Sequence, residues 1–429
     1  MSVADPLSER EPQPDIVVVG GGIVGLCCAL ALQRRGRRVL LIDRDEPCEQ
    51  ASRWNAGVWA TSSLVPLANP GLPPRLAGLL LGRTPGFRLD PHALPSLTNW
   101  GLRFLRSCRE GPFARGTAAL AALISASRAA HEVLLAEAGA TDLRRREGWL
   151  HLHRTPDGLA AARKLGPLYE RHGVEHEVLD ATAVRACEPS LAPLYAGGLL
   201  FRGSAAILDP GALARSYLGL FLHRGGSVLR AEVRAIVPEE GAWQVRSADG
   251  GTRRARDVVI SAGPWSPGLL RPLGVRLPMM VERGTMRRFA LGAGTALERP
   301  VFDAAAGIVL SPRPGGVQVS SGTFLTRPES RATSPQWERA ERDARAVLRL
   351  GSALDGGPVT ADRPTLPDCL PAIGAVPGRD GLWLCCGHQH VGFSTSAGSG
   401  ELLAAAICGT PADPALADKA TAFAPDRFL

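Results

Sequence analysis

The feature that most constrains this chain is a glycine-rich turn between an apolar strand and a helix near the start of the sequence. Residues 16–19 are Ile-Val-Val-Val, then come Gly20, Gly22 and Gly25, and a second apolar strand ends in Asp43. In a βαβ unit the first glycine makes the turn, the second admits a pyrophosphate and the third lets helix and sheet pack. Glycine turns also serve packing alone, but this arrangement predicts a dinucleotide site, with Asp43 accepting from a ribose hydroxyl.

Composition excludes several classes of protein. In 429 residues, 45% are hydrophobic and 21% are charged, which excludes both a disordered chain and a small disulfide-stabilised scaffold. The net charge of +8 is carried almost entirely by arginine, and no basic run is interleaved with aromatic residues, so we expect no nucleic-acid partner. An arginine-rich surface leaves open a peripheral contact with anionic lipid or with an acidic protein.

Cysteine usage and targeting signals predict a reduced, cytoplasmic protein. The nine cysteines contain no C-x-x-C pair, so neither a disulfide framework nor a zinc site is expected. Residues 1–15 lack the basic and apolar regions of a signal peptide, and no run of apolar residues is long enough for a membrane span. His388 and His390 share a turn without a further spaced ligand, and we expect no metal. Peripheral attachment to the inner face of the membrane stays open.

Periodicity along the rest of the chain alternates between helix and strand. Apolar spacing predicts strands at 257–260 and 382–386, and an alternating pattern predicts strands at 286–290, 308–310 and 317–320. Helices are expected at 117–138, 212–224, 335–350 and 396–408. Segments with helical periodicity and segments with strand-like alternation interleave along the chain, and no repeat of fixed period occurs. The sequence therefore indicates two domains, each built from separate segments.

Three further blocks resemble one enzyme family. A strand at 257–260 runs into Ser-Ala-Gly-Pro-Trp-Ser, Ser52-x-x-Asn55-Ala56-Gly57 follows Asp43, and residues 363–374 read Arg-Pro-Thr-Leu-Pro-Asp-Cys-Leu-Pro-Ala-Ile-Gly ahead of the turn 387–392. With these blocks the chain resembles FAD-dependent amine oxidoreductases of the D-amino acid oxidase superfamily. It is most similar to bacterial D-amino acid dehydrogenases and D-hydroxyproline dehydrogenases, over nearly the whole sequence.

The resemblance implies an α/β (α+β) fold in two interleaved parts. A Rossmann-type, glutathione-reductase-like FAD-binding domain would comprise residues 15–90, 195–272 and 355–429. A mostly antiparallel substrate-binding domain would comprise residues 91–194 and 273–354. The stretch between about 70 and 195 matches the family only loosely, and substrate specificity is expected there.

The resemblance also implies the site residues. Arg363 would clamp the substrate carboxylate with a two-pronged guanidinium, Arg283 is the alternative clamp, and His390 would lie beside the substrate; Arg363 and His390 are the expected catalytic residues. Contacts with the cofactor are expected from Gly20, Gly22, Ile23, Val24, Gly25, Asp43, Arg44, Ser52, Asn55, Ala56, Gly57, Val233, Ala262, Gly263, His388, Val391 and Gly392.

Non-covalent attachment of FAD follows from two departures from the family pattern. Relatives with covalent flavin carry a His in the first loop or a Cys just before the Thr-x-Pro-Asp run, where this chain has Trp54-Asn55 and Ala361-Asp362. Cys369 lies after that run, so we expect it to serve packing.

The expected reaction is oxidation of a Cα–N bond. Hydride passes from Cα to flavin N5, leaving an imine or, after hydrolysis, a 2-oxo acid and ammonia. The resemblance implies a D-amino acid or D-hydroxyproline-type substrate and an electron acceptor that is a quinone, an electron-transfer protein or oxygen. Three alternatives stay open: the catalytic subunit of a hetero-oligomeric amine, opine or hydroxyproline dehydrogenase, an oxygen-using secondary-amine oxidase, and a non-catalytic nucleotide-binding protein.

Overall fold

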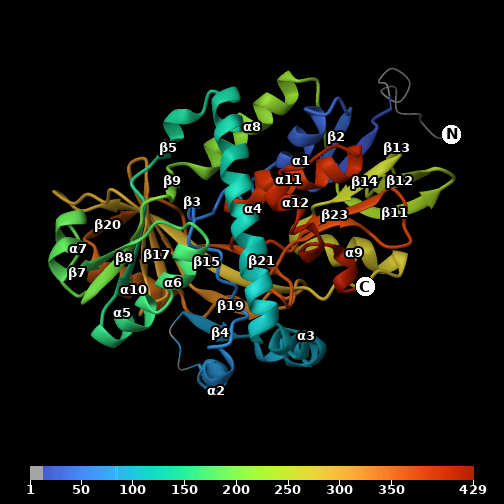
Figure 1. Cartoon of the computed structure of the whole chain (residues 1–429). Coiled ribbons are helices and arrows are strands. Elements are labelled where there is room, and N and C mark those ends of the chain that lie inside the picture. Colours follow the sequence, from blue (N-terminus) through green and yellow to red (C-terminus); the bar gives the residue numbers. More distant parts are fainter. Residues whose placement is uncertain (1–12, 83, 85) are drawn as a thin grey trace.

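Two large β-sheets with their helices, together with two three-stranded sheets, form the described part of the molecule (Figure 1). The structure is a computed structural model that describes residues 13–429 except 83 and 85. The expectation of a polar leader without a signal peptide concerns residues 1–15 and so lies almost entirely outside the described residues.

The first sheet carries the βαβ unit expected from the glycine motif. Its strands run in the order β10-β2-β1-β14-β23-β22, parallel except for the last. Apolar runs form its strands because both faces are covered. The strands are β1 (Ile16–Val19), β2 (Val39–Asp43), β10 (Ser227–Arg230), β14 (Asp257–Ile260), β22 (Ala372–Ala375) and β23 (Leu382–Cys386). The expected strands at 16–19, 257–260 and 382–386 are confirmed.

Helices α1 (Ile23–Gln33), α8 (Pro210–His223) and α11 (Gly392–Cys408) pack together beside this sheet. Close approach is possible because α11 carries small residues: a Cβ at Gly400 would lie 2.6 Å from the carbonyl oxygen of Cys27 on α1. A three-stranded antiparallel sheet of β11 (Val233–Glu239), β12 (Ala242–Ser247) and β13 (Thr252–Ala255) extends the same half of the molecule.

Helix α4 (Glu110–Glu137) crosses the molecule between the two halves and packs on α11 (Figure 1). A Cβ at Gly398 of α11 would lie 2.8 Å from the amide nitrogen of Ser127 of α4, so the two backbones are nearly in contact. Among the described residues α4 is the one helix long and apolar enough to cross a membrane. From the sequence we expected no membrane-spanning helix because no uninterrupted apolar run is long enough, and α4 contains no such run. In the fold its Leu120, Leu123 and Leu135 are buried in the core.

The second sheet has eleven strands and is mostly antiparallel. Its order is β4-β19-β15-β18-β17-β16-β6-β8-β7, and β20 and β21 also pair with the long strand β15. The strands are β4 (Phe87–Leu89), β6 (Trp149–His153), β7 (Glu177–Asp180), β8 (Gly197–Phe201), β15 (Met280–Leu291), β16 (Val301–Asp303), β17 (Ile308–Arg313), β18 (Gly316–Ser320), β19 (Thr323–Thr326), β20 (Leu350–Ala353) and β21 (Val359–Thr365).

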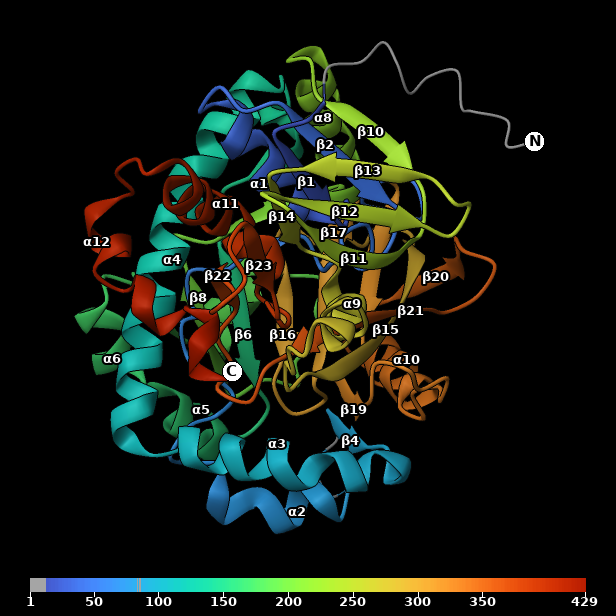
Figure 2. The same cartoon turned by 90° about the vertical axis from the view of Figure 1, so that its right-hand side faces the viewer.

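The remaining elements cover the sheets or join them. Helices α2 (Leu76–Leu80) and α3 (Leu94–Ser107) lie together at one end of the molecule (Figure 2). The others are α5 (Pro156–Arg163), α6 (Gly166–Arg171), α7 (Ala181–Cys187), α9 (Ser266–Leu270), α10 (Trp337–Val347) and α12 (Pro414–Ala417), with a small sheet of β3 (Val58–Trp59), β9 (Ala205–Ile207) and β5 (Arg144–Arg145).

Strand pairing departs from the expected domain boundaries at three places. Strands β4, β8 and β21 fall in segments assigned by sequence to the FAD-binding domain, yet all three pair within the eleven-stranded sheet. The membership of such short strands depends on partners distant in the chain, which local periodicity does not report. The boundaries themselves stay a prediction.

Candidate active site

One cavity of about 1520 Å³ joins the two sheets and contains most of the residues singled out in the sequence. It runs from the glycine turn after β1, past β15 and β21, to α2 and α3. The expected site residues that line it are Gly20, Gly22, Ile23, Val24, Asp43, Arg44, Ser52, Asn55, Ala56, Val233, Ala262, Gly263, Arg283, Arg363, His388, His390 and Gly392.

Gly25, Gly57 and Val391 do not line the cavity. Gly25 serves packing, because a Cβ there would lie 1.9 Å from the carbonyl oxygen of Gly20. Gly57 has φ +70° and its Cβ would lie 2.4 Å from the carbonyl oxygen of Ile207. Both glycines therefore allow close backbone packing beside the site, and the expected contacts of Gly25, Gly57 and Val391 with the cofactor stay a prediction.

The glycine turn is tied down by side chains from neighbouring loops. Asp43 Oδ2 accepts from the Gly21 amide at 2.5 Å, and Ser52 Oγ accepts from the Ile23 amide at 2.9 Å, at the N-terminus of α1. Burial raises the pKa of Asp43, although the amides of Asp45 and Gly21 oppose this. Asp43 and Ser52 thus lie where a ribose and a pyrophosphate would meet a Rossmann helix.

The turn after β23 points two of its side chains in different directions. His388 is buried, donates to or accepts from Ser399 Oγ of α11 at 3.0 Å, and desolvation lowers its pKa to about 3. It holds the turn against α11 in the neutral form. Gln389 has φ +51°, a left-handed conformation that is costly for a side chain with a Cβ. Its side chain lies at the cavity wall.

Arg363 projects from β21 into the cavity. Its Nη2 donates to the carbonyl oxygen of Gly322 at 3.1 Å, and the guanidinium lies over Gly284 of β15, where a Cβ would come within 1.8 Å of Nη2. Desolvation lowers the pKa of Arg363, while the charges of Glu282 and Asp362 oppose the shift. The guanidinium keeps donors for a ligand in the cavity.

Arg283, the alternative clamp, is already engaged. Its Nε and Nη2 bind both oxygens of Asp362 at 2.6 and 2.7 Å, and its Nη1 and Nη2 donate to the carbonyl oxygens of Ala332 and Ser330. The two-pronged guanidinium is thus used to join β15, β21 and the loop before α10. The structure therefore argues against Arg283 as the group that grips a substrate carboxylate.

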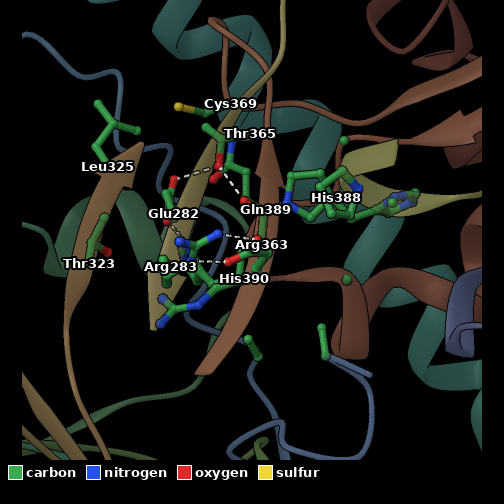
Figure 3. A pocket seen from close by; sticks show the side chains of 18 of the residues that line it. Glu282, Arg283, Thr323, Leu325, Arg363, Thr365, Cys369, His388, Gln389 and His390 are labelled. Carbon is green, nitrogen blue, oxygen red and sulfur yellow. Dashed lines mark hydrogen bonds and ion pairs between the residues drawn. The ribbon is translucent and has the colours of Figure 1, made fainter. Parts of the chain in front are cut away.

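Glu282 is the residue that sequence reasoning missed. It lies on β15, is 3% exposed, and faces the same cavity as Arg363 (Figure 3). Its Oε1 accepts from Thr365 Oγ1 at 2.8 Å. Its buried Oε2 has no hydrogen-bond partner among the described residues and lies 3.8 Å from Nδ1 of His390, an ion-pair distance. Burial opposes ionisation of Glu282, but His390, Arg363 and Thr365 outweigh it and lower its pKa. The available signal was a single carboxylate among the arginines and apolar residues of its strand.

Comparison with known proteins identifies the family. The model of the DAO family, described as FAD dependent oxidoreductase, matches residues 15–406. The chain belongs to this family. A D-amino acid dehydrogenase 2 of Ralstonia nicotianae is 33% identical over 411 residues, covering 91% of this chain and 95% of the relative. A D-amino-acid oxidase of Bradyrhizobium diazoefficiens is 28% identical, covering 96% and 99%.

Solved structures share the fold of this FAD-dependent oxidoreductase. Glycine oxidase from Geobacillus kaustophilus superposes with a TM-score of 0.72 at 20% identity, covering 98% of this chain and all of its own. L-proline dehydrogenase from P. horikoshii superposes with a TM-score of 0.71 at 16% identity, covering 97% and 98%. The expected α/β flavoprotein fold is confirmed.

The residues present fit FAD, the cofactor of the family. A cavity of about 1520 Å³ exceeds the ~300–1,000 Å³ of an ordinary ligand site, which leaves room for a dinucleotide and a substrate. Gly20 has φ +106° and its Cβ would lie 2.4 Å from the Ser261 carbonyl oxygen, so a bare backbone is required at this point of the turn. The buried Ser261 Oγ has no hydrogen-bond partner among the described residues, as is typical of a polar atom whose hydrogen bond is completed by a ligand.

Proposed function

We propose that this chain is a D-amino acid dehydrogenase that oxidises the Cα–N bond of its substrate. The observation that carries the proposal is the position of Arg363: a guanidinium with donors to spare lies in the same cavity as the glycine turn and Asp43. The relatives named D-amino acid dehydrogenase and D-amino-acid oxidase support the substrate class.

FAD, when bound, accepts a hydride from the substrate. The protein has to orient Cα and to exclude water, and both tasks fall to residues of the cavity. A guanidinium holds a carboxylate by two parallel hydrogen bonds, so Arg363 would fix both the position and the rotation of Cα. Trp100, Phe104 and Leu325 form part of an apolar wall that keeps water from the reacting carbon.

The electron acceptor and the location are part of the same proposal. Helices α2 and α3 expose Leu80, Leu81, Leu94 and Leu102, each more than half accessible, at one end of the molecule (Figure 2). The cavity reaches this surface, since Leu80 and Leu94 also line it. A lipid-soluble quinone, which takes up two electrons and two protons, could reach the site from a membrane along this apolar route.

Charge favours a membrane with anionic headgroups as the occupant of this leucine-bearing surface. The sequence from 66 to 109 contains six arginines and a single acidic residue, Asp90, which is buried. Arg75, Arg106 and Arg109 are exposed around the leucines. Leucine with a basic fringe is typical of segments that lie in the lipid interface, whereas protein-protein hot spots favour Trp, Tyr and Arg over Leu.

Co-sedimentation with vesicles tests the membrane contact. The holoenzyme should bind phosphatidylglycerol vesicles and keep part of this binding in high salt, because the leucines add a contact that salt does not screen. Leu81→Glu with Leu102→Glu should abolish binding, and Leu222→Glu, an exposed leucine on α8, is the matched control. Equal binding by all variants, or self-association through the leucines in size exclusion, would overturn the assignment.

Anaerobic reduction of the bound flavin tests the reaction. We expect D-amino acids to bleach the flavin absorbance and their L-enantiomers to leave it unchanged. Bleaching by N-methylglycines or opines alone would instead favour the secondary-amine or opine alternatives. Coloured subunits that co-purify would favour a hetero-oligomer. A flavin that no amine reduces would point to the non-catalytic alternative.

A further inference from the structure

The cavity holds a buried negative charge that the proposed reaction does not use. Glu282 ends in a carboxylate whose Oε2 has no hydrogen-bond partner, although the side chain is 3% exposed. An ionised carboxylate is costly to bury without compensation. In the free protein Arg363 supplies positive charge nearby, and Nδ1 of His390 lies 3.8 Å from Oε2.

Binding of a substrate changes this balance. Once Arg363 holds the substrate carboxylate, its charge is neutralised, and Glu282 then needs another cation. His390 Nδ1 lies 3.8 Å from Oε2, an ion-pair distance but too far for a hydrogen bond, and its side chain is 38% exposed. A cation on the ligand could supply the hydrogen bond that Oε2 lacks.

The register of the two strands separates Glu282 from the Arg363 guanidinium. Glu282 pairs with Arg363 across β15 and β21. The guanidinium extends over Gly284, whereas the Glu282 carboxylate turns the other way, to Thr365, which pairs with Met280. The Arg363 guanidinium and the Glu282 carboxylate therefore point in opposite directions along the strand. Such a separation suits a ligand that has a carboxylate at one end and a cation at the other.

The chemistry of the reaction argues against the α-amine as this cation. Hydride leaves Cα only when the neighbouring nitrogen is uncharged and can donate its electron pair. A permanent carboxylate against that nitrogen would stabilise the ammonium form and hold the proton. The partner of Glu282 is then a charge at the far end of the substrate.

The wall beside Glu282 suits the stem of such a side chain. Thr323 and Leu325 lie on the neighbouring strand β19, where Leu325 pairs with Glu282, and both line the same cavity (Figure 3). Lysine and arginine side chains place methylene groups along apolar surface and keep the charge at the end.

We propose that Glu282 forms a subsite for the cationic end of the substrate side chain, so that basic D-amino acids are preferred substrates. This inference rests on the proposed function and names the substrate class within it. The step requires no chemistry beyond binding.

Pairs of substrates matched in shape but not in charge test the subsite. D-Arginine is compared with D-citrulline, and D-lysine with D-norleucine, in anaerobic stopped-flow reduction of the holoenzyme flavin. A charge-assisted hydrogen bond at Glu282 should make the apparent rate constant for D-arginine at least about tenfold higher than for D-citrulline at low concentration. In Glu282→Gln this ratio should fall towards one.

Glu240→Gln serves as the control, since Glu240 is exposed on the turn between β11 and β12, outside the cavity; it should keep the wild-type ratio. A wild-type ratio near or below one overturns the subsite, and so does a ratio that Glu282→Gln leaves unchanged. If Glu282→Gln loses FAD, the ratio of the D-arginine to the D-citrulline rate constant is compared between wild type and Glu282→Asp instead. Reduction by neutral D-amino acids without a preference for charge refutes the subsite alone, whereas no reduction by any D-amino acid refutes the proposed function as well.

Discussion

The guanidinium of Arg363 occupies the space that a side chain at residue 284 would need. An ideal Cβ on Gly284 would lie 1.8 Å from Nη2 of Arg363 and 2.9 Å from its Cζ. The glycine on β15 is thus the counterpart of the arginine on β21, and the pair fixes the position of the guanidinium in the cavity.

Gly284→Ala should displace Arg363 without removing it. We expect kcat/KM for a D-amino acid to fall about tenfold or more, because the guanidinium has to leave its place and a misplaced clamp costs orientation. Flavin content should stay normal. Gly219→Ala, at an open position on helix α8, is the control and should keep full activity. An unchanged kcat/KM in Gly284→Ala would show that the position of the Arg363 guanidinium does not matter for substrate binding.

Replacing the arginines should distinguish their roles. Arg363→Ala should cost about 3 kcal/mol of transition-state stabilisation and so lower kcat/KM on the order of a hundredfold. Arg363→Lys should recover little of this activity, because lysine keeps the positive charge but lacks the two-pronged guanidinium. Arg283→Ala should instead lower thermal stability, since it leaves Asp362 and two carbonyl groups without their donor. Steady-state kinetics and thermal unfolding of both variants check this, and an exchange of the two phenotypes would reverse the assignment.

Acid precipitation should release FAD into the supernatant. The family's attachment positions carry Trp54-Asn55 and Ala361-Asp362 here. Cys369 is buried and desolvation raises its thiol pKa, so the thiolate needed for attack on a flavin is disfavoured. Flavin absorbance that stays with the pellet would contradict a non-covalent cofactor.

Asp43→Ala should weaken retention of FAD. Asp43 accepts from the Gly21 amide and lies at the cavity. Loss of a charge-assisted acceptor is worth roughly 1.5 to 3 kcal/mol, or about ten- to a hundredfold in the dissociation constant. Flavin fluorescence during dilution measures this constant, with Asp43→Asn as the partial replacement. An unchanged constant would show that Asp43 does not bind the ribose.

Acid should destabilise the protein through three histidines. Desolvation lowers the pKa of His131, His151 and His388 to about 3 each, against ~6.5 for an unfolded histidine. The unfolded chain therefore binds more protons between these values. Stability is fully present above pH ~6.5 and falls towards pH ~3, by up to about 1.4 kcal/mol per pH unit for each histidine.

His131→Gln isolates one of these groups. His131 stacks on Trp59 and its ring nitrogens bond Tyr217 and Ser396, so the substitution lowers stability at every pH. The informative measurement is the slope of the unfolding free energy against pH between pH 5 and 6. In His131→Gln this slope should decrease by an amount that corresponds to at most one bound proton. A slope equal to that of wild type would mean that His131 is protonated in the folded state.

Local sequence was sufficient wherever the decisive residues are contiguous. The turn from Gly20 to Gly25, the acidic end of β2 at Asp43 and the apolar strands beside them predicted a Rossmann unit, because each element contributes a backbone requirement that a short window reveals. The resemblance carried by residues 363–374 extended this to FAD and to Arg363, and the family comparison confirmed the cofactor.

Tertiary structure decided which charged side chains face the cavity. Consecutive residues of a strand alternate in side-chain direction, and on β15 Glu282 pairs with Arg363 whereas Arg283 pairs with Asp362. Pairing with β21 then placed Asp362 against Arg283 and left Arg363 over Gly284. The sequence alone determined that a flavin site with candidate arginines exists. Only the register between β15 and β21, some eighty residues apart in the chain, decided that Arg363 keeps donors for the cavity and that Glu282 lines the same cavity. Register is set by long-range pairing and not by local pattern.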